Sequence, residues 1–324
     1  MIFFYLAASI IVLVLLVVVI ASFYMFRFAI GKDSKASAEK LIQNMKDRYK
    51  DDPEKSKWGY MIEEGYNEFL SRPFEDVYMT NRDGMKLHGY LLECENATKT
   101  VIFSHGWHSV ALFDFSCIWS YYEAHKFNVL IIDHRAHGKS EGKYVCFGVK
   151  ERYDVVDWAL WVGERFGENM KIFLSGISMG SATVMMALGT EGLPDTVVGA
   201  SCDCGYTSAT DIFKHVLKIG FHLPAFPILN VAGLISKLVA KFDFEEFTSL
   251  DGLKKAKIPV YFIHGTKDGF VPVEHTYANR AACASDYTEA IVENADHGLS
   301  FFTDPNAVRE GLEALLRKQF SDFE

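Results

Sequence analysis

One serine in the chain stands in a setting that favours nucleophilic chemistry. Ser178 is the centre of the pentapeptide Gly-Ile-Ser-Met-Gly at 176–180, which lies between the apolar runs 172–174 and 182–188. Between a strand and a helix, a Gly-x-Ser-x-Gly sequence is typical of a tight, strained turn that exposes the serine oxygen. Glycines are expected on both sides because side chains there would collide where strand and helix approach closely. The alternative is an ordinary glycine-flanked turn, so the context must decide.

Short apolar strands alternate with helices from residue 100 onward. Strands buried on both faces that alternate with helices indicate a mostly parallel sheet with helices on both faces. Before this region, the runs 74–80 and 85–92 flank the turn sequence Asn-Arg-Asp-Gly, which predicts an antiparallel hairpin. We expect strands at 101–103, 129–132, 172–174, 196–201, 260–263 and 287–292, and helices at 111–125, 152–166, 182–188, 274–283 and 305–320.

Polar residues gather directly after these predicted strands. In open parallel sheets, binding sites lie at the carboxyl ends of the strands. We therefore expect the polar loops to open on the same edge of the sheet. They lie at 104–108, 133–140, Ser178, Asp203, 264–268 and 294–298.

The region from 74 to 320 resembles the α/β-hydrolase superfamily, in particular its esterase, monoglyceride-lipase-like and serine-aminopeptidase-like members. The resemblance implies the α/β-hydrolase fold, with a mostly parallel sheet, helices on both faces, an antiparallel opening hairpin and a helical cap insertion. The matching features are the hairpin, the pair His105 and Gly106, the loop Asp133-x-Arg135-x-x-Gly138-x-Ser140, the turn at 176–180, and Asp268 and His297 in the family's order.

The resemblance also implies a catalytic triad. A serine hydroxyl needs a base within hydrogen-bond reach and a third group that orients this base. In the superfamily the order is serine, acid, histidine, which Ser178, Asp268 and His297 satisfy. Two alternatives stay open. Asp203 also follows a strand and is a rival acid, and His275 is a rival base that we expect to be a surface residue of a helix.

An oxyanion hole is implied by the same resemblance. Acyl transfer develops negative charge on the carbonyl oxygen, and each preorganised donor contributes about 10² to 10³ in rate. In the family the donors are backbone N–H groups after the nucleophile and after the His-Gly pair. Here these residues are Met179 and Trp107. The Trp107 indole either walls the acyl pocket or only packs.

The loop at 133–140 is expected to be structural, with Arg135 pairing with a carboxylate and Gly138 allowing a tight turn. His134 and His137 form a candidate metal pair, but no further ligand at a characteristic spacing accompanies them, so we predict no metal site. The turn at 176–180 lacks the lysine of a phosphate-binding loop, and we expect no cofactor.

The N-terminal segment is long and apolar enough to cross a bilayer. Between Ile2 and Phe26 the chain carries no charge, and a helix over this segment spans roughly 37 Å, more than the hydrocarbon core of about 30 Å. Aromatic residues cluster at both ends, as in segments that anchor at membrane interfaces. The alternative is a cleaved signal peptide, which is disfavoured because no basic region precedes the apolar run.

We expect residues 1–30 to form a single-pass transmembrane anchor in the cell membrane. Residues 31–72 are expected to be a juxtamembrane helical spacer broken near Pro53, and residues 73–324 the α/β-hydrolase domain with a cap at about 206–253. Basic residues after the anchor predict a cytoplasmic location for the domain. These residues are Arg27, Lys32, Lys35 and Lys40.

Composition limits the partners. A net charge of -9 and a pI near 5.7 argue against nucleic acid, which is bound by clustered Lys and Arg. The six cysteines show no zinc-finger spacing and no dense disulfide pattern, which favours a reducing compartment. We expect Cys202 and Cys204 to be core thiols. Oligomeric state is not indicated.

These observations predict a membrane-anchored serine hydrolase that cleaves ester-type bonds through an acyl-enzyme on Ser178. Carboxylesters, acylglycerols and thioesters are the expected substrates, which are small or lipid-like esters. The apolar helical spacing of the cap fits such substrates, although any cap needs it for packing. The alternatives are a serine peptidase or acyltransferase and, in another class, a non-catalytic hydrolase-like interaction protein, which usually lacks a triad member.

Overall fold

The centre of the molecule is an eight-stranded sheet in the computed structural model, which describes residues 1–32 and 36–323. Lys35, counted above among the basic residues of the flank, lies outside the described residues. The strand order is β1-β2-β4-β3-β5-β6-β7-β8. β2 pairs antiparallel with β1 and β4, and all pairs from β4 to β8 are parallel, which confirms the predicted hairpin and sheet. The strands are β1 (Glu75–Thr80), β2 (Lys86–Leu92), β3 (Lys99–Ser104), β4 (Phe127–Ile132), β5 (Lys171–Ile177), β6 (Val197–Asp203), β7 (Val260–Gly265) and β8 (Tyr287–Val292).

Helices cover both faces of the sheet, as predicted. Because side chains alternate along a strand, Ile102 faces one core while Val101 and Phe103 face the other. α6 and α7 pack in the first core, and α5 and α13 in the second. The helices of this region are α4 (Ala111–Asp114), α5 (Trp119–Ala124), α6 (Glu151–Phe166), α7 (Met179–Ala187), α11 (Glu274–Ala282), α12 (Ser300–Thr303) and α13 (Pro305–Gln319).

The single helix expected at 111–125 is wrong, because the chain forms α4 and α5 with a turn between them. The turn lies where another helix packs tightly. A Cβ at Gly65 would overlap the carbonyl of Ser116, and the Trp119 indole donates to the Gly65 carbonyl at 3.0 Å. The turn between α4 and α5 thus fits against the helix that contains Gly65, where a continuous helix was expected.

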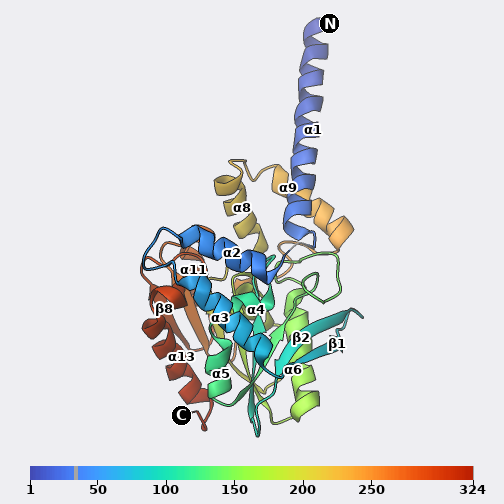
Figure 1. Ribbon diagram of the computed structural model, residues 1–324. Helices are drawn as coiled ribbons and strands as arrows, with labels where there is room; N and C mark the ends of the chain where they lie inside the picture. The colour runs from blue at the N-terminus through green and yellow to red at the C-terminus, as the bar shows by residue number, and fades with distance from the viewer. Residues whose placement is uncertain (33–35, 324) are drawn as a thin grey trace.

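The N-terminal helix α1 (Ile2–Ile30) projects from the body of the molecule (Figure 1). It is the described helix that is long and apolar enough to cross a membrane. None of its residues up to Ala21 is buried, whereas its last turns are inserted in the protein. The buried residues are Ser22, Met25, Phe26, Ala29 and Ile30.

Two helices follow, α2 (Ala38–Tyr49) and α3 (Trp58–Ser71), separated near Pro53 as expected. These helices, which form the segment predicted as a juxtamembrane helical spacer, contact the sheet domain. Phe69 of α3 is buried in the second core with Trp119, and Arg48 of α2 pairs with Asp296. The polar segment therefore packs on the sheet domain, because it carries its own buried apolar residues.

Between β6 and β7 the chain forms α8 (Ala209–Gly220), α9 (Ile228–Ile235), the π-helix η1 (Ser236–Ala240) and α10 (Ser249–Leu253). α8 and α9 lie at the base of α1 (Figure 1), and α9 packs directly against it. α10 instead packs on α7, where Gly252 contacts the backbone of Met185. The part of the insertion beside α1 thus includes α8 and α9.

Candidate active site

Ser178 lies on a strained turn between β5 and α7. Its φ of 55° and ψ of -117° place a non-glycine residue in a sparsely populated region, which is typical of functional turns. The predicted need for flanking glycines is confirmed. A Cβ at Gly176 would overlap the backbone of Gly180, and one at Gly180 would overlap the backbone of Ser104.

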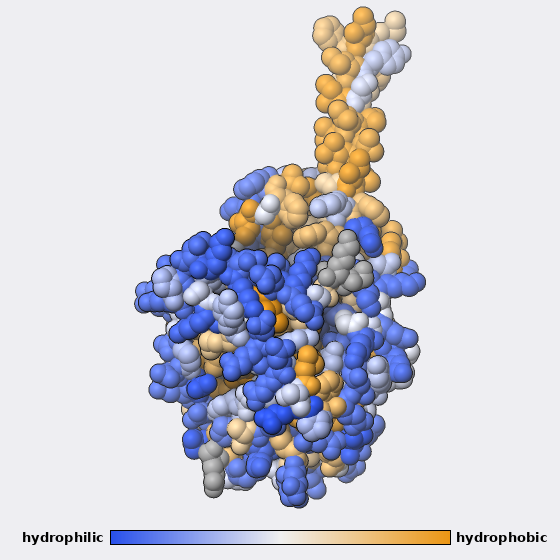
Figure 2. Space-filling view, viewed as in Figure 1, coloured by the Kyte–Doolittle hydropathy of each residue, from blue (hydrophilic) through white to orange (hydrophobic). Residues whose placement is uncertain are grey.

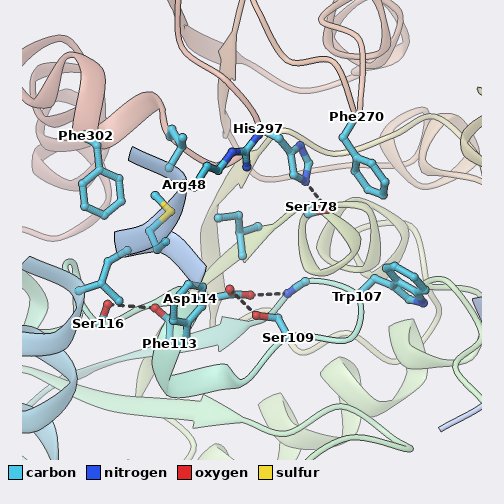
Figure 3. Close-up of a pocket in the computed structure, with 16 residues that line it drawn as sticks. Arg48, Trp107, Ser109, Phe113, Asp114, Ser116, Ser178, Phe270, His297 and Phe302 are labelled. Atoms are coloured by element: carbon cyan, nitrogen blue, oxygen red, sulfur yellow. Dashed lines mark hydrogen bonds between the residues drawn. The ribbon is translucent and has the colours of Figure 1, made fainter. Parts of the chain in front are cut away.

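A chain of hydrogen bonds connects Ser178, His297 and Asp268. Ser178 Oγ lies 2.9 Å from His297 Nε2 (Figure 3). His297 Nδ1 lies 2.6 Å from Asp268 Oδ2. With a proton on Nδ1, the imidazole donates to the carboxylate and accepts from the serine hydroxyl. The three residues come from the turn after β5, the loop after β7 and the loop after β8. The structure therefore brings together the predicted residues.

Asp268 is held as a carboxylate. Its Oδ1 accepts the backbone N–H groups of Phe270 at 2.9 Å and Val271 at 2.7 Å. Burial favours the neutral form, but hydrogen bonds from His264 and His297 outweigh it and keep the pKa of Asp268 well below its usual range. His264, whose Nε2 lies 3.1 Å from the same carboxylate, was not singled out by the sequence analysis because no motif marks it.

The rival acid is placed differently. Asp203 accepts the backbone N–H of Ser178 through its main-chain carbonyl at 2.8 Å, and among the described residues its buried Oδ1 has no hydrogen-bond partner. Burial raises the pKa of its carboxyl group to about 6. Asp203 therefore supports the turn through its backbone, whereas the carboxylate that meets His297 belongs to Asp268.

His275, the rival base, is half-buried rather than on the surface as expected. Its Nδ1 lies 2.9 Å from the Thr207 hydroxyl and accepts the Thr207 backbone N–H at 3.2 Å. Burial lowers the pKa of its imidazole. His275 points inward because the first turn of α11, which contains it, faces the segment after β6.

Both predicted oxyanion donors lie next to Ser178. Met179 is the first residue of α7, where backbone N–H groups have no partner inside the helix. The loop before Trp107 also lies beside Ser178, since a Cβ at Gly106 would be 3.5 Å from the Ser178 Cβ. The Trp107 indole donates to the carbonyl of Ala29 at 2.7 Å, so it connects the site with the end of α1.

Asp114 is a residue of the site that the sequence did not reveal. Its Oδ2 accepts the backbone N–H of Gly106 at 2.7 Å, and its Oδ1 accepts the Ser109 hydroxyl at 2.6 Å (Figure 3). Burial raises the pKa of its carboxyl group to about 6, although these bonds oppose the effect. Asp114 thus fixes the loop that presents the Trp107 backbone.

Two cavities meet at Ser178. The first, which we call the apolar pocket, has a volume of about 260 Å³, and the second, the polar pocket, about 290 Å³. Ser178, Trp107 and Phe270 line both. The apolar pocket is also lined by Met25, Phe28 and Ala29 of α1, by Phe147 and Tyr206, by Ile212, Phe213, Val216 and Gly220 of α8, and by Phe221, which follows α8. The polar pocket includes Arg48, Ser109, Asp114, Ser116 and His297 beside apolar residues.

The loop at 133–140 is built as predicted. Arg135 Nε donates to Asp154 at 2.6 Å, and Gly138 has a φ of 45°, where a Cβ would overlap Asp133. The predicted core thiols at 202 and 204 are also confirmed, since both are free and buried.

The two histidines of the loop at 133–140, His134 and His137, belong to the core. His137 accepts the His108 backbone N–H at 3.2 Å, and its other ring nitrogen lies 3.0 Å from the Arg135 carbonyl. Burial lowers the pKa of His134 to about 3 and holds the pKa of His137 well below its usual value. Both rings are therefore neutral packing groups.

Similarity to known proteins agrees with this architecture. A family model described as serine aminopeptidase, S33 matches residues 95–231. The chain is 26% identical over 236 residues to the uncharacterized protein YqkD of Bacillus subtilis, which covers 72% of this chain and 76% of that protein. It is 26% identical over 226 residues to the α/β hydrolase domain-containing protein WAV2 of Arabidopsis thaliana, which covers 66% of this chain and 68% of WAV2.

Among solved structures, an esterase from Pyrococcus furiosus has a TM-score of 0.61 and 23% sequence identity, covering 78% of this chain and 93% of the esterase chain. At this identity the likeness concerns the fold, which is the α/β-hydrolase fold. The chain thus has the α/β-hydrolase fold, and its residues 95–231 match the family model.

Proposed function

We propose that the chain is a serine hydrolase that cleaves ester-type bonds through an acyl-enzyme on Ser178. The observation that carries the proposal is the hydrogen-bonded series Ser178, His297 and Asp268 at the junction of the apolar and polar pockets. An apolar cavity beside a nucleophile suits an acyl group. Carboxylesters, acylglycerols and thioesters share this acyl group and are the proposed substrate class.

In the proposed mechanism His297 takes the proton of Ser178 as the oxygen attacks the acyl carbonyl. The backbone N–H groups of Met179 and Trp107 stabilise the negative charge on the carbonyl oxygen. His297 then donates the proton to the departing alcohol or thiol, which leaves through the polar pocket. A water molecule activated by His297 attacks the acyl-enzyme, releases the acid and restores Ser178.

Asp268 orients the imidazole and stabilises its protonated form in both steps. Because the pKa of Asp268 is held low, this carboxylate carries its charge throughout. Asp114 acts through the loop that it supports and is a positioning residue, not a group that touches the reacting atoms.

A peptidase is the second candidate, because the matching family model is described as a serine aminopeptidase. An aminopeptidase needs a carboxylate that receives the substrate's amino group. In the polar pocket the Asp114 carboxylate already accepts bonds from Gly106 and Ser109, which favours the ester substrate. Transfer of the acyl group to an alcohol instead of water is the other variant of the same chemistry.

We also propose that the exposed part of α1 anchors the protein in the cell membrane as a single-pass helix. Its length and composition support this reading. Arg27 and Lys32 at its C-terminal end favour a cytoplasmic domain through the positive-inside preference.

Labelling with a fluorophosphonate probe tests the hydrolase proposal on the full chain. The wild type should react and Ser178→Ala should not, and Ser178→Ala should lower ester turnover by about 10⁴-fold or more. His297→Ala should be similarly inactive, whereas His275→Ala should keep most of the activity. Labelling that persists in Ser178→Ala would rule out the nucleophile.

Acyl p-nitrophenyl esters and aminoacyl anilides, compared at equal concentration, distinguish esterase from peptidase activity. Faster turnover of the acyl esters is expected. A preference for the anilides would favour the peptidase, and the melting temperature of each variant checks that it is folded.

A further inference from the structure

The cap exposes a set of large apolar side chains beside α1. Figure 2 shows apolar residues gathered over the cap at the base of this helix. Phe226 is 76% exposed, Leu238 63% and Leu234 55%. Such a concentration on one face marks an interaction surface. We call it the cap apolar face, and its members are Ile219, Leu223, Phe226, Leu234, Leu238 and Val239.

This face lies where the exposed part of α1 ends. The Ser22 hydroxyl of α1 donates to the carbonyl of Ile228 in α9 at 3.0 Å, and α9 packs against α1. From Ile2 to Ala21, α1 is not buried, a length of roughly 30 Å that matches the hydrocarbon core of a bilayer. If a bilayer surrounds this part of α1, the membrane surface nearest the sheet domain lies at the level of the cap.

The segment that carries this face is basic, although Asp243 and Glu245 line a neighbouring cavity together with Phe226 and Leu234. Between residues 212 and 242 the chain has four lysines and no acidic residue, in a protein of net charge -9. Lys214 and Lys237 pair with acids at the borders of this segment. No ion pair involves Lys218 or Lys241 among the residues that the structure describes. Exposed lysines beside apolar residues suit the anionic headgroup region of a membrane.

The apolar pocket ends at the same place. Phe28 of α1 and Gly220 of α8 line this pocket, and both are exposed. Gly220 directly follows Ile219 of the cap apolar face. The edge of the apolar pocket that α1 and α8 form therefore lies beside the cap apolar face.

We propose that the cap apolar face inserts into the bilayer beside α1, with Lys218 and Lys241 at anionic headgroups. The occupant of this face is the lipid bilayer, and acyl chains reach the apolar pocket from the membrane rather than from water. The inference rests on the proposed membrane span of α1, whereas it holds whichever bond Ser178 cleaves.

Spin labels on the full chain in nanodiscs that contain an anionic phospholipid test this proposal. A nitroxide is attached at Leu238→Cys, with Val14→Cys in α1 as the lipid reference and Leu160→Cys in α6 as the water reference. Leu160 is a matched control because it is an exposed leucine, 43% accessible, on a helix of the sheet domain. Background labelling of the native cysteines is measured on the chain without an added cysteine.

The readout is relaxation by oxygen, which concentrates in lipid, against relaxation by a water-soluble nickel complex. The Leu238 label should resemble the Val14 label, with at least several-fold lower nickel accessibility than the Leu160 label. Replacing both lysines, Lys218→Glu and Lys241→Glu, should raise nickel accessibility at Leu238.

Three results would overturn the inference. A Leu238 label as water-accessible as Leu160, with Val14 in lipid, leaves the anchor intact and removes the cap from the membrane. Dipolar broadening between Leu238 labels shows a second copy on this face. Water access at Val14 contradicts the membrane span itself, and loss of fluorophosphonate labelling in the unmodified chain contradicts only the proposed hydrolase.

Discussion

At the residue scale, two buried aspartates near Ser178 have opposite electrostatic surroundings. Asp268 accepts backbone N–H groups and faces His264 and His297, so its charged form is favoured despite burial. In the described part of the chain no such donor reaches Oδ1 of Asp203, and burial raises the pKa of this carboxyl group. A low pKa suits the residue that stabilises an imidazolium, because this carboxylate must stay charged.

Replacement of each acid by asparagine should separate these roles. Asp268→Asn cannot hold the correct imidazole tautomer, so kcat should fall by about 10⁴-fold. Asp203→Asn leaves the backbone bond to Ser178 in place and should change kcat by less than about 10-fold. Steady-state ester hydrolysis gives both values. Equal losses in the two variants would contradict the assignment.

Site residues could be predicted from the sequence wherever a motif constrains the backbone or the chain order. The glycines around Ser178 report a steric requirement, and His297 and Asp268 follow from the order of the superfamily. Asp114 and His264 carry no such signal. Their importance depends on contacts with Gly106 and Asp268, which only the folded chain defines.

At the element scale, periodicity predicted the sheet well because each strand alternates with a helix. It did not predict that α4 and α5 are separate, since the turn between them is set by packing against α3. Nor did it place the end of α1 in the apolar pocket. Hydrophobicity identifies a possible membrane helix, but Met25 and Phe28 contact the pocket through long-range packing.

Two truncations test whether α1 is both an anchor and a pocket wall. Removal of residues 1–21 deletes the part that is not buried and should keep the activity within about 3-fold, because Met25, Phe28 and Ala29 remain. Removal of 1–30 also deletes the buried residues and the acceptor of the Trp107 indole. Burial of a large apolar side chain contributes about 1.5 to 3 kcal/mol, so the melting temperature should fall.

Membrane fractionation, ester hydrolysis and thermal unfolding of both truncated chains provide the measurements. The longer truncation should also lose selectivity among acyl chain lengths, since one wall of the apolar pocket is absent. If the two truncated chains were equally stable and selective, α1 would have no part in the pocket.

At the scale of the whole molecule, buried histidines and buried aspartates both affect how the stability of the fold changes as the pH falls. His105, His134 and His137 are buried together, and burial lowers their pKa, to about 3 for the first two. Asp114 and Asp203 have pKa values raised to about 6. These groups act in opposite directions when the pH falls.

The histidines dominate between pH 7 and 5.5. An unfolded histidine takes up a proton near pH 6.5 while the buried one does not, so each costs about 1.4 kcal/mol per pH unit below 6.5. Protonation of the folded aspartates stabilises the fold, but only from about pH 6 downward. Three histidines against two aspartates should therefore make the protein less stable at pH 5.5 than at pH 7.5.

His134→Leu should reduce this loss. Neither ring nitrogen of His134 has a hydrogen-bond partner among the described residues, so a leucine of similar size removes a buried polar group without breaking a side-chain bond. The variant should lose about 1 kcal/mol less than the wild type between pH 7.5 and 5.5, because one titrating group is absent. Thermal unfolding of both chains at the two pH values measures the difference. An unchanged loss in the variant would show that the acid response arises outside this histidine cluster.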